Sequence, residues 1–411
     1  MQKIMQLPDI FIRNTREIMG DERFQQYLES FDEEPPVSIR LNPMKVGDGR
    51  WKVKGGEAVP WCRYGYYLPS RPNFTMDPLL HAGCYYVQEA ASMFVSHVLR
   101  QFVREPVTML DLCAAPGGKS TAAIATLPEG SMLYSNEPVR QRANILLENI
   151  TKWGYPNCIV TNNYPEVYRK SKHLFDLILC DVPCSGEGMF RKDEATIHEW
   201  SPQNVERCQQ LQRDIVADAW ACLREGGLLI YSTCTFNTKE NEENIRWICE
   251  EYDAEVLPVD IKPEWNITGS LLPDFNAPVC RFIPGISRGE GLFMAVLRKR
   301  LSPSPSLLRE GRNGSKSEQG RLNVLPNLNR EVDGMEVGIP LSYPQAIAYL
   351  RGEALFLPPD TPHGIVEVCF MGHRLGTVKN IGTRANNLYP KEWRIKTTHI
   401  PTDYEAILEH T

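Results

Sequence analysis

The chain has 411 residues, of which 42% are hydrophobic, and a formal net charge of −6 at pH 7. This length allows two or three domains with a sizeable core, and no stretch reaches the about 18 apolar residues that a membrane-spanning helix needs. The acidic balance argues only weakly against a nucleic-acid partner, because a binding face needs local charge and not a basic total.

The cysteines and histidines argue against a disulfide framework and a zinc site. Twelve cysteines are spread over the chain without a Cys-x-x-Cys pair, and the eight histidines add no zinc spacing. We therefore expect reduced thiols in a cytoplasmic protein and no bound metal.

The N-terminal segment is predicted to contain amphipathic helices. Between residues 3 and 31, apolar side chains recur at near-helical spacing, namely Leu7, Phe11, Ile18, Phe24 and Leu28. Glu34-Pro35-Pro36 ends this unit. Residues 37–43 then alternate apolar and polar side chains, which indicates a strand.

Residues 86–300 alternate strand-like and helix-like segments. Strands are expected at 107–113, 131–137, 158–163, 174–181, 227–233 and 291–298, and helices at 88–102, 119–127, 139–153, 203–223 and 238–252. This alternation predicts an α/β fold with a mostly parallel sheet covered on both faces. Because such sheets bind ligands at the carboxyl ends of their strands, the residues after each strand are the candidates for chemistry.

A glycine-rich turn follows the first of these strands, with the sequence Cys113-Ala114-Ala115-Pro116-Gly117-Gly118-Lys119. A P-loop would need Gly where Cys113 stands, and the dinucleotide fingerprint Gly-x-Gly-x-x-Gly is missing. Glu137 comes about 20 residues later, the interval at which a carboxylate can bond ribose hydroxyls. A loop without a phosphate signature but with a ribose-binding acid fits S-adenosylmethionine. The alternative is an ordinary tight turn of an α/β domain.

Two cysteines lie in matched settings further along the chain. Cys184 belongs to Asp181-Val182-Pro183-Cys184-Ser185-Gly186 and Cys234 to Ser232-Thr233-Cys234-Thr235, each after an apolar, β-rich run. Both thiols are therefore placed where a substrate would bind. Two thiols there suit chemistry in which one attacks covalently and the other helps the adduct to leave. Spacing alone does not tell the two apart.

Together these motifs resemble the Nop/Sun family of RNA cytosine-5 methyltransferases, and within it the bacterial RsmF type. The matching segments are 86–93, 111–120, 135–137, 181–188, 191–192 and 231–235. The family commonly has an Asp near the adenine after the third strand, where spacing places Asn163 here. An amide can still bond adenine, but without a charge.

The resemblance implies an organisation for the whole chain. Residues 86–300 would form a Rossmann-like class I methyltransferase domain whose last strand is antiparallel. Residues 1–85 would form a helical and small α+β subdomain that binds RNA, with Arg40 and Asn42 as candidate contacts. Residues 301–340 are rich in Ser, Pro and Gly and read as a linker. Residues 341–411 would form a β-rich, PUA-like RNA-binding domain.

The C-terminal segment carries local positive charge, as an RNA-binding domain would need. Between residues 363 and 399 it has six basic and two acidic side chains, a local balance of +4. A solvated surface without a partner is the alternative for this charge.

The resemblance also implies roles for the site residues. Cys234 would attack carbon 6 of cytosine and Cys184 would assist release, while Asp181 would contact the base edge and border the cofactor. S-adenosylmethionine would be bound by Cys113, Ala114, Ala115, Pro116, Gly117, Gly118, Lys119, Glu137, Asn163 and Asp181. Arg191 and Lys192 would bind phosphates of the target.

The expected partner is RNA, with ribosomal RNA of the small subunit (16S) as the first target, and the expected protein is a monomer without membrane contact. Three alternatives stay open: methylation of transfer RNA, methylation of DNA cytosine, and a ribosome-assembly protein that binds RNA without catalysis. The pair of cysteines argues against the last, because pure binding needs neither thiol.

Overall fold

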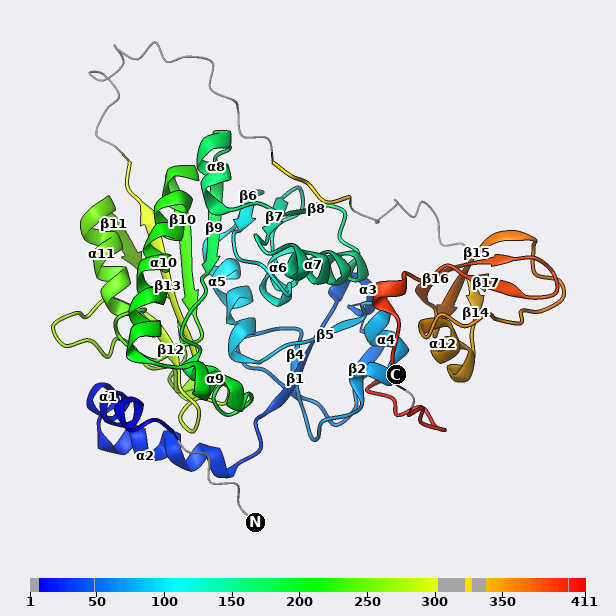
Figure 1. The fold of residues 1–411 in the computed structure, drawn as a ribbon, viewed down its shortest axis with the longest axis horizontal. Coiled ribbons are helices and arrows are strands. Elements are labelled where there is room, and N and C mark those ends of the chain that lie inside the picture. The colour runs from blue at the N-terminus through cyan, green and yellow to red at the C-terminus, as the bar shows by residue number, and fades with distance from the viewer. Residues whose placement is uncertain (1–6, 48, 302–321, 327–337, 398) are drawn as a thin grey trace, which may run out of the picture. The chain divides into compact units, whose positions relative to one another are not determined.

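The computed structural model describes residues 7–47, 49–301, 322–326, 338–397 and 399–411 (Figure 1). Contacts divide them into two compact units. The first takes its described residues from Met1–Pro36, Glu89–Leu147 and Asn157–Pro326, and the second from Val37–Gln88, Glu148–Pro156 and Asn327–Thr411. These two units are discontinuous in sequence, whereas the sequence predicts four consecutive segments. The boundaries of those four segments stay a prediction.

The first unit is built on a mostly parallel sheet. Among the described residues this sheet has eight strands, in the order β11-β13-β10-β9-β6-β7-β8 with β12 beside β13. The strands are β6 (Thr108–Asp111), β7 (Met132–Asn136), β8 (Cys158–Thr161), β9 (Phe175–Asp181), β10 (Leu223–Thr233), β11 (Ala254–Leu257), β12 (Cys280–Phe282) and β13 (Leu292–Lys299). β6 to β10 run parallel and β13 runs antiparallel to β10. The predicted parallel sheet and antiparallel last strand are confirmed.

Helices cover this sheet on both faces. They are α5 (Phe94–Phe102), α6 (Gly118–Ile124), α7 (Arg140–Trp153), α8 (Pro165–Ser171), α10 (Pro202–Cys222) and α11 (Glu242–Tyr252). The short helix α9 (Glu194–Glu199) packs instead with the N-terminal segment. Apolar residues of α10 and α11 pack with those of β6, β9 and β10 in one buried cluster. Figure 1 shows α5 and α6 on the opposite side of the sheet. α10 begins where the hydroxyl of Ser201 accepts a hydrogen bond from the Asn204 N–H and Pro202 fills the first helical position.

The predicted N-terminal helices are present as α1 (Asp9–Met19) and α2 (Asp21–Glu29). Their buried aromatic side chains meet aromatics from the loops that follow β9 and β10. The rings of Phe11 and Phe190 lie 4.9 Å apart, and those of Tyr27 and Phe236 lie 5.3 Å apart. The helices therefore cover the outside of the loops that carry the two cysteines.

The second unit is rich in short strands. They are β1 (Val37–Leu41), β2 (Trp51–Val53), β3 (Glu57–Ala58), β4 (Gly65–Leu68), β5 (Tyr85–Val87), β14 (Ile339–Pro340), β15 (Gly364–Phe370), β16 (His373–Asn380), β17 (Ala385–Asn387) and β18 (Leu408–His410). Its helices are α3 (Pro43–Val46), α4 (Pro78–His81) and α12 (Tyr343–Leu350). β1 to β5 except β2 form one sheet, β14 to β17 form another, and β18 pairs with β2.

Arg40 and Asn42 are buried in this unit, so the expectation that they contact RNA is wrong. The Arg40 guanidinium donates to the Gln88 side chain at 2.8 Å and lies over the Trp153 ring. The Asn42 amide donates to the carbonyls of Gly83 and Trp153. Both side chains satisfy buried polar groups and hold segments distant in sequence together.

Candidate functional site

The register of two parallel strands brings the predicted thiols together. Asp181 of β9 lies opposite Ser232 of β10, and the Val182 N–H donates to the Ser232 carbonyl at 3.0 Å. The following loops therefore leave the sheet side by side. The sulfur atoms of Cys184 and Cys234 lie 3.1 Å apart, and the Cys234 N–H donates to the Cys184 sulfur at 3.4 Å.

The two thiols are not equivalent. The hydrogen bond that it shares with Cys234 and then its burial raise the pKa of Cys184 well above that of an ordinary thiol. Either thiol can be the donor of the hydrogen bond between them, and the raised pKa favours the protonated form at Cys184. A donor at that distance stabilises negative charge on Cys234, the state in which sulfur is a nucleophile.

Two buried glutamates connect the cysteine loops, and sequence reasoning missed both roles. The Glu187 carboxylate accepts hydrogen bonds from the N–H groups of Phe236 and Asn237, at 2.7 and 2.8 Å, and from the Trp200 indole. The Glu240 carboxylate accepts from the Ser185 N–H at 3.0 Å. Glu187 lies inside the Cys184 motif, which was the available signal, whereas nothing in the sequence marks Glu240.

A charged pair stands beside the thiols. The Lys119 ammonium lies 2.8 Å from an Asp181 carboxylate oxygen. Burial alone would lower the pKa of Lys119, but attraction to Asp181, with a smaller contribution from Cys234, raises it overall. Lys119 therefore stays charged, and its positive charge lies where it can also attract negative charge at Cys234.

The glycine-rich turn forms the tight bend that the sequence predicts. Gly117 has φ +114°, a left-handed conformation that favours glycine, and α6 begins at the next residue. The Ala114 N–H donates to the Asn136 carbonyl at 2.8 Å, and the Arg142 guanidinium donates to the Ala115 carbonyl. Burial raises the pKa of the Cys113 thiol well above its usual range, which favours its protonated form.

Glu137 offers a buried acceptor next to this turn. One carboxylate oxygen accepts from the Val139 N–H at 2.9 Å, whereas Oε2 has no hydrogen bond and only an ion pair with Arg142 at 3.3 Å. A buried acceptor without a donor is costly, and the half-exposed Arg142 side chain can shift to admit one. Glu137 therefore fits the ribose hydroxyls of an S-adenosyl ligand.

Asn136 and Asn163 link the ends of neighbouring strands. The Asn136 amide donates to the carbonyls of Leu112 and Asn163 and accepts from the Asn163 N–H. The Asn163 side chain contacts the backbone of Asn323, accepting its N–H at 3.0 Å and donating to its carbonyl at 3.4 Å. Asn163 thus lies at the predicted place with part of its hydrogen-bonding capacity already used, and its contact with adenine stays a prediction.

Asp111 is a further acidic group that sequence reasoning left without a role. Its Oδ2 accepts from the Ser120 hydroxyl at 2.6 Å, while Oδ1 has no hydrogen bond. Burial raises the pKa of this carboxyl to about 7, with the Ser120 hydrogen bond acting in the other direction.

Arg191 does not face a ligand. Its side chain is 5% exposed, forms an ion pair with Glu290 at 3.2 Å and donates to the Glu33 carbonyl. The expectation of a phosphate contact is therefore wrong for Arg191, whereas Lys192 is exposed.

Two searches of the described residues found no candidates. No group of three or more His, Cys, Asp or Glu side chains among them is arranged to hold a metal ion. In the same part of the chain, no helix combines the length and the apolar character that crossing a membrane requires.

Comparison with known proteins gives the family. Three family models match: 16S rRNA methyltransferase RsmB/F over residues 101–298, the N-terminal domain of 16S rRNA methyltransferase RsmF over 7–90, and the methyltransferase RsmF PUA domain over 337–395. The ribosomal RNA small subunit methyltransferase F of Salmonella heidelberg is 32% identical over 333 residues, which are 75% of this chain and 67% of the relative. The chain belongs to the RsmF-type group of the Nop/Sun family.

A second curated relative agrees with this assignment, and two solved structures share the fold. The RsmF-type relative from Shigella flexneri is 32% identical over 319 residues, and the match spans 72% of this chain and 64% of that relative's length. A methyltransferase homologue from Pyrococcus horikoshii shares the fold with a TM-score of 0.61 and 25% identity, over 72% of this chain and 96% of that one. NSun6 from the same organism, solved with the S-adenosylmethionine analogue SFG, has a TM-score of 0.60 and 19% identity, over 73% of this chain and 100% of its own.

The first prediction tests Glu137 in this RsmF-type protein. We expect Glu137→Ala to weaken S-adenosylmethionine binding by about 1.5–3 kcal/mol, the range for a hydrogen bond to a charged group, measured by titration calorimetry. Glu137→Gln keeps an oxygen for the Val139 N–H and should lose less. The exposed Glu166→Ala is the matched control. Wild-type affinity in Glu137→Ala would remove this residue from the cofactor site.

Proposed function

We propose that this protein methylates carbon 5 of a cytosine in RNA, with small-subunit (16S) ribosomal RNA as the substrate and S-adenosylmethionine as the methyl donor. The observation that carries the proposal is the pair of sulfur atoms 3.1 Å apart at the ends of two adjacent parallel strands. The printed names of the RsmF-type relatives support the ribosomal target. We further propose a monomer that works in the cytoplasm, where its free cysteines stay reduced.

The chemistry requires a covalent step at the base. Carbon 5 of cytosine is a poor nucleophile, and addition of a thiolate to carbon 6 makes carbon 5 enamine-like. The cofactor, when bound, supplies an electrophilic methyl group. Cys234 is the attacking thiol in this proposal, as the resemblance to the Nop/Sun family implies, and the raised pKa of Cys184 agrees with that choice.

Lys119 and Asp181 hold and polarise the base. One third of the Asp181 side chain is exposed, so its carboxylate can accept a hydrogen bond from the N4 amino group of cytosine and hold the edge of the base. Lys119 fixes that carboxylate and keeps a positive charge beside the thiols. Because the target base must reach both sulfur atoms, it has to leave any stack in the RNA.

Release completes the reaction. A base takes the proton at carbon 5, the electron pair of that C–H bond restores the double bond between carbons 5 and 6, and the Cys234 sulfur leaves with the electron pair of its bond to carbon 6. Cys184 lies next to the Cys234 sulfur and assists this elimination in our proposal. The 3.1 Å separation lets one side chain attack while the other stays within reach of the adduct.

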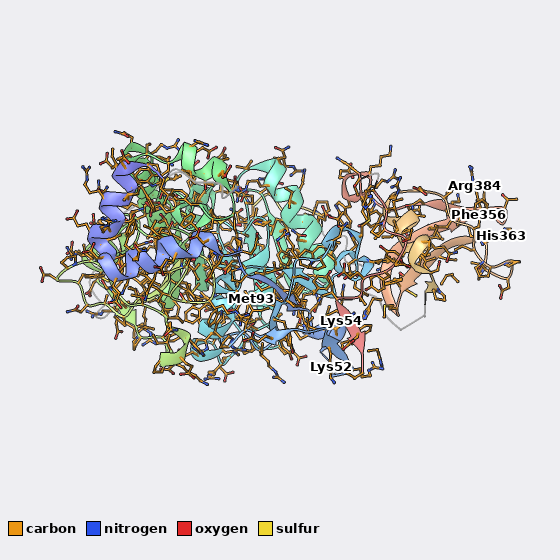
Figure 2. The ribbon with its side chains drawn as sticks, turned by 90° about the horizontal axis from the view of Figure 1, so that it is seen from below. Lys52, Lys54, Met93, Phe356, His363 and Arg384 are labelled. Atoms are coloured by element: carbon orange, nitrogen blue, oxygen red, sulfur yellow. The ribbon has the colours of Figure 1, made fainter. Side chains whose placement is uncertain are left out.

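The C-terminal sheet offers a surface for the RNA. Leu355 and Ala385 exchange backbone hydrogen bonds, which places Phe356 next to Arg384, and Lys379 lies opposite Ile365 on the neighbouring strands. Phe356 is 77% exposed, and Figure 2 shows it in the same region as Arg384 and His363. An exposed ring among cations suits stacking of an unpaired base and contact with phosphates.

The proposed function can be tested directly. The protein is incubated with labelled S-adenosylmethionine and, in separate reactions, with 16S ribosomal RNA, small ribosomal subunits, transfer RNA or DNA, followed by nucleoside analysis. We expect 5-methylcytosine in ribosomal RNA, as naked RNA or in the subunit. Label only in transfer RNA or DNA would move the proposal to that substrate, and no label in any of them would favour an RNA-binding protein without catalysis.

The second prediction separates the two thiols. Cys234→Ala should bind RNA and cofactor yet form neither adduct nor product, whereas Cys184→Ala should attack and then stall. The stalled species is a covalent protein–RNA complex, which a denaturing gel detects as a slow band. The double variant Cys184→Ala/Cys234→Ala is the control and should give no band. A covalent band from Cys234→Ala, with none from Cys184→Ala, would reverse the assignment.

The third prediction concerns Phe356. Phe356→Ala should weaken binding of single-stranded RNA by about 1–3 kcal/mol, the value of one base stacked on an aromatic ring, while S-adenosylmethionine affinity stays unchanged. Phe356→Trp should retain the affinity, and Ile261→Ala is the control for an exposed apolar side chain in the other unit. Fluorescence anisotropy with labelled RNA measures the effect. Equal affinities for Phe356→Ala and wild type would exclude stacking at this residue.

A further inference from the structure

A short stretch of chain returns to the edge of the methyltransferase sheet after its last strand. Residues 322–326, here called the edge strap, lie beside β8, the final strand in the sheet order. The Leu325 N–H donates to the Val160 carbonyl at 2.8 Å, and the Asn162 N–H donates to the Asn323 carbonyl at 3.0 Å. Thr161 and Val324 form an antiparallel bridge. The strap therefore satisfies backbone groups that an open sheet edge would leave exposed.

The strap has a buried and an exposed residue next to each other. Leu325 is 3% exposed, and Leu322 packs against the cluster that also contains residues of β6 and β9. Val324, between Leu325 and Asn323, is 52% exposed. Adjacent residues of the strap therefore offer a buried and an exposed position for comparison.

The strap holds the side chain of Asn163 by its backbone. The Asn163 oxygen accepts from the Asn323 N–H at 3.0 Å, and the Asn163 amide nitrogen donates to the Asn323 carbonyl at 3.4 Å. An amide oxygen has two acceptor lone pairs, so one is left for another partner, whereas the amide nitrogen also hydrogen-bonds the Tyr168 hydroxyl. The Asn323 N–H also fixes the orientation of the Asn163 amide, because only the amide oxygen can accept a hydrogen bond from it.

Hydrogen bonds also connect the strap to the segment around Glu137, the proposed ribose-binding residue. The Asn162 side chain, whose backbone is held by the strap, donates to the carbonyls of Glu137 and Pro138 at 2.7 and 2.9 Å. The Asn163 N–H bonds to Asn136, the residue before Glu137. Two adjacent asparagines thus connect the strap to the segment that presents the Glu137 carboxylate, whose Oε2 has no hydrogen bond.

We propose that the edge strap is a positioning element of the cofactor site. By holding Asn162 and Asn163 it fixes the ends of β7 and β8 against which the adenosine part of S-adenosylmethionine binds. The affinity for the cofactor therefore depends on a segment outside the alternating α/β region, in the stretch of sequence that leads to the C-terminal sheet. The inference rests on the proposed cofactor site at Glu137. If the strap only covers the sheet edge, its loss changes stability and leaves cofactor affinity unchanged.

The test compares two neighbouring substitutions in the full-length protein. Leu325→Asp puts a charge into a buried position and should detach the strap, whereas Val324→Asp changes an exposed position and should not. Titration calorimetry with S-adenosylmethionine gives the affinity, and hydrogen exchange of residues 158–163 and 322–326 reports whether the strap stays paired. We expect Leu325→Asp to exchange faster and to bind about tenfold more weakly, the loss of one strong hydrogen bond. Val324→Asp should match the wild type in both measurements.

One further variant removes the strap by a second route. Replacing residues 322–326 by five Gly and Ser residues detaches it if Leu325→Asp leaves it paired. Wild-type affinity in a variant whose exchange shows a detached strap overturns the proposal. If Glu137→Ala also retains wild-type affinity, the cofactor site itself is misassigned. If Glu137→Ala weakens binding and strap loss does not, only the positioning role fails.

Discussion

The parallel pairing of β9 with β10 is the constraint on which the rest of the site depends. Opposite partners such as Asp181 and Ser232 fix where each strand ends, so the loops carrying Cys184 and Cys234 start at the same level. Because side chains alternate between the faces of a sheet, a slip of one residue would turn the strand ends to the opposite face and separate the two sulfur atoms. The buried carboxylates of Glu187 and Glu240 then hold the two loops at their 3.1 Å sulfur separation.

Buried ion pairs hold the neighbouring loops in one arrangement. The Arg281 guanidinium bonds to the Glu242 carboxylate and to the Phe236 carbonyl, which fixes the segment after Cys234. Arg191 and Glu290 form a second pair beneath the segment after Cys184. Such pairs add little net stability relative to apolar contacts, but removing one partner leaves a buried charge uncompensated. Their role here is therefore geometric, since they select one conformation for loops that have to present two thiols.

The alternation of strands and helices and the motifs at the strand ends could be predicted from the sequence, because both depend on local patterns. It was insufficient where the deciding partner lies far along the chain. Arg191 looks like a phosphate contact until Glu290 is known to pair with it, and Arg40 looks exposed until Gln88 and Trp153 enclose it. Short elements such as α8 and α9 carry too few residues for a periodic signal. The pairing of residues 322–326 with β8 joins two segments that are far apart in the sequence, so no local sequence pattern predicts it.

The Lys119–Asp181 pair joins the two halves of the site, since Lys119 belongs to the turn after β6 and Asp181 ends β9 next to the Cys184 loop. Each charge depends on the other. Without Asp181, burial would lower the pKa of Lys119, and the positive charge beside Cys234 would be weakened. Without Lys119, the Asp181 carboxylate would have no fixed orientation toward a base. The glycine-rich turn is therefore connected by a direct ion pair to the strand end that precedes the Cys184 loop.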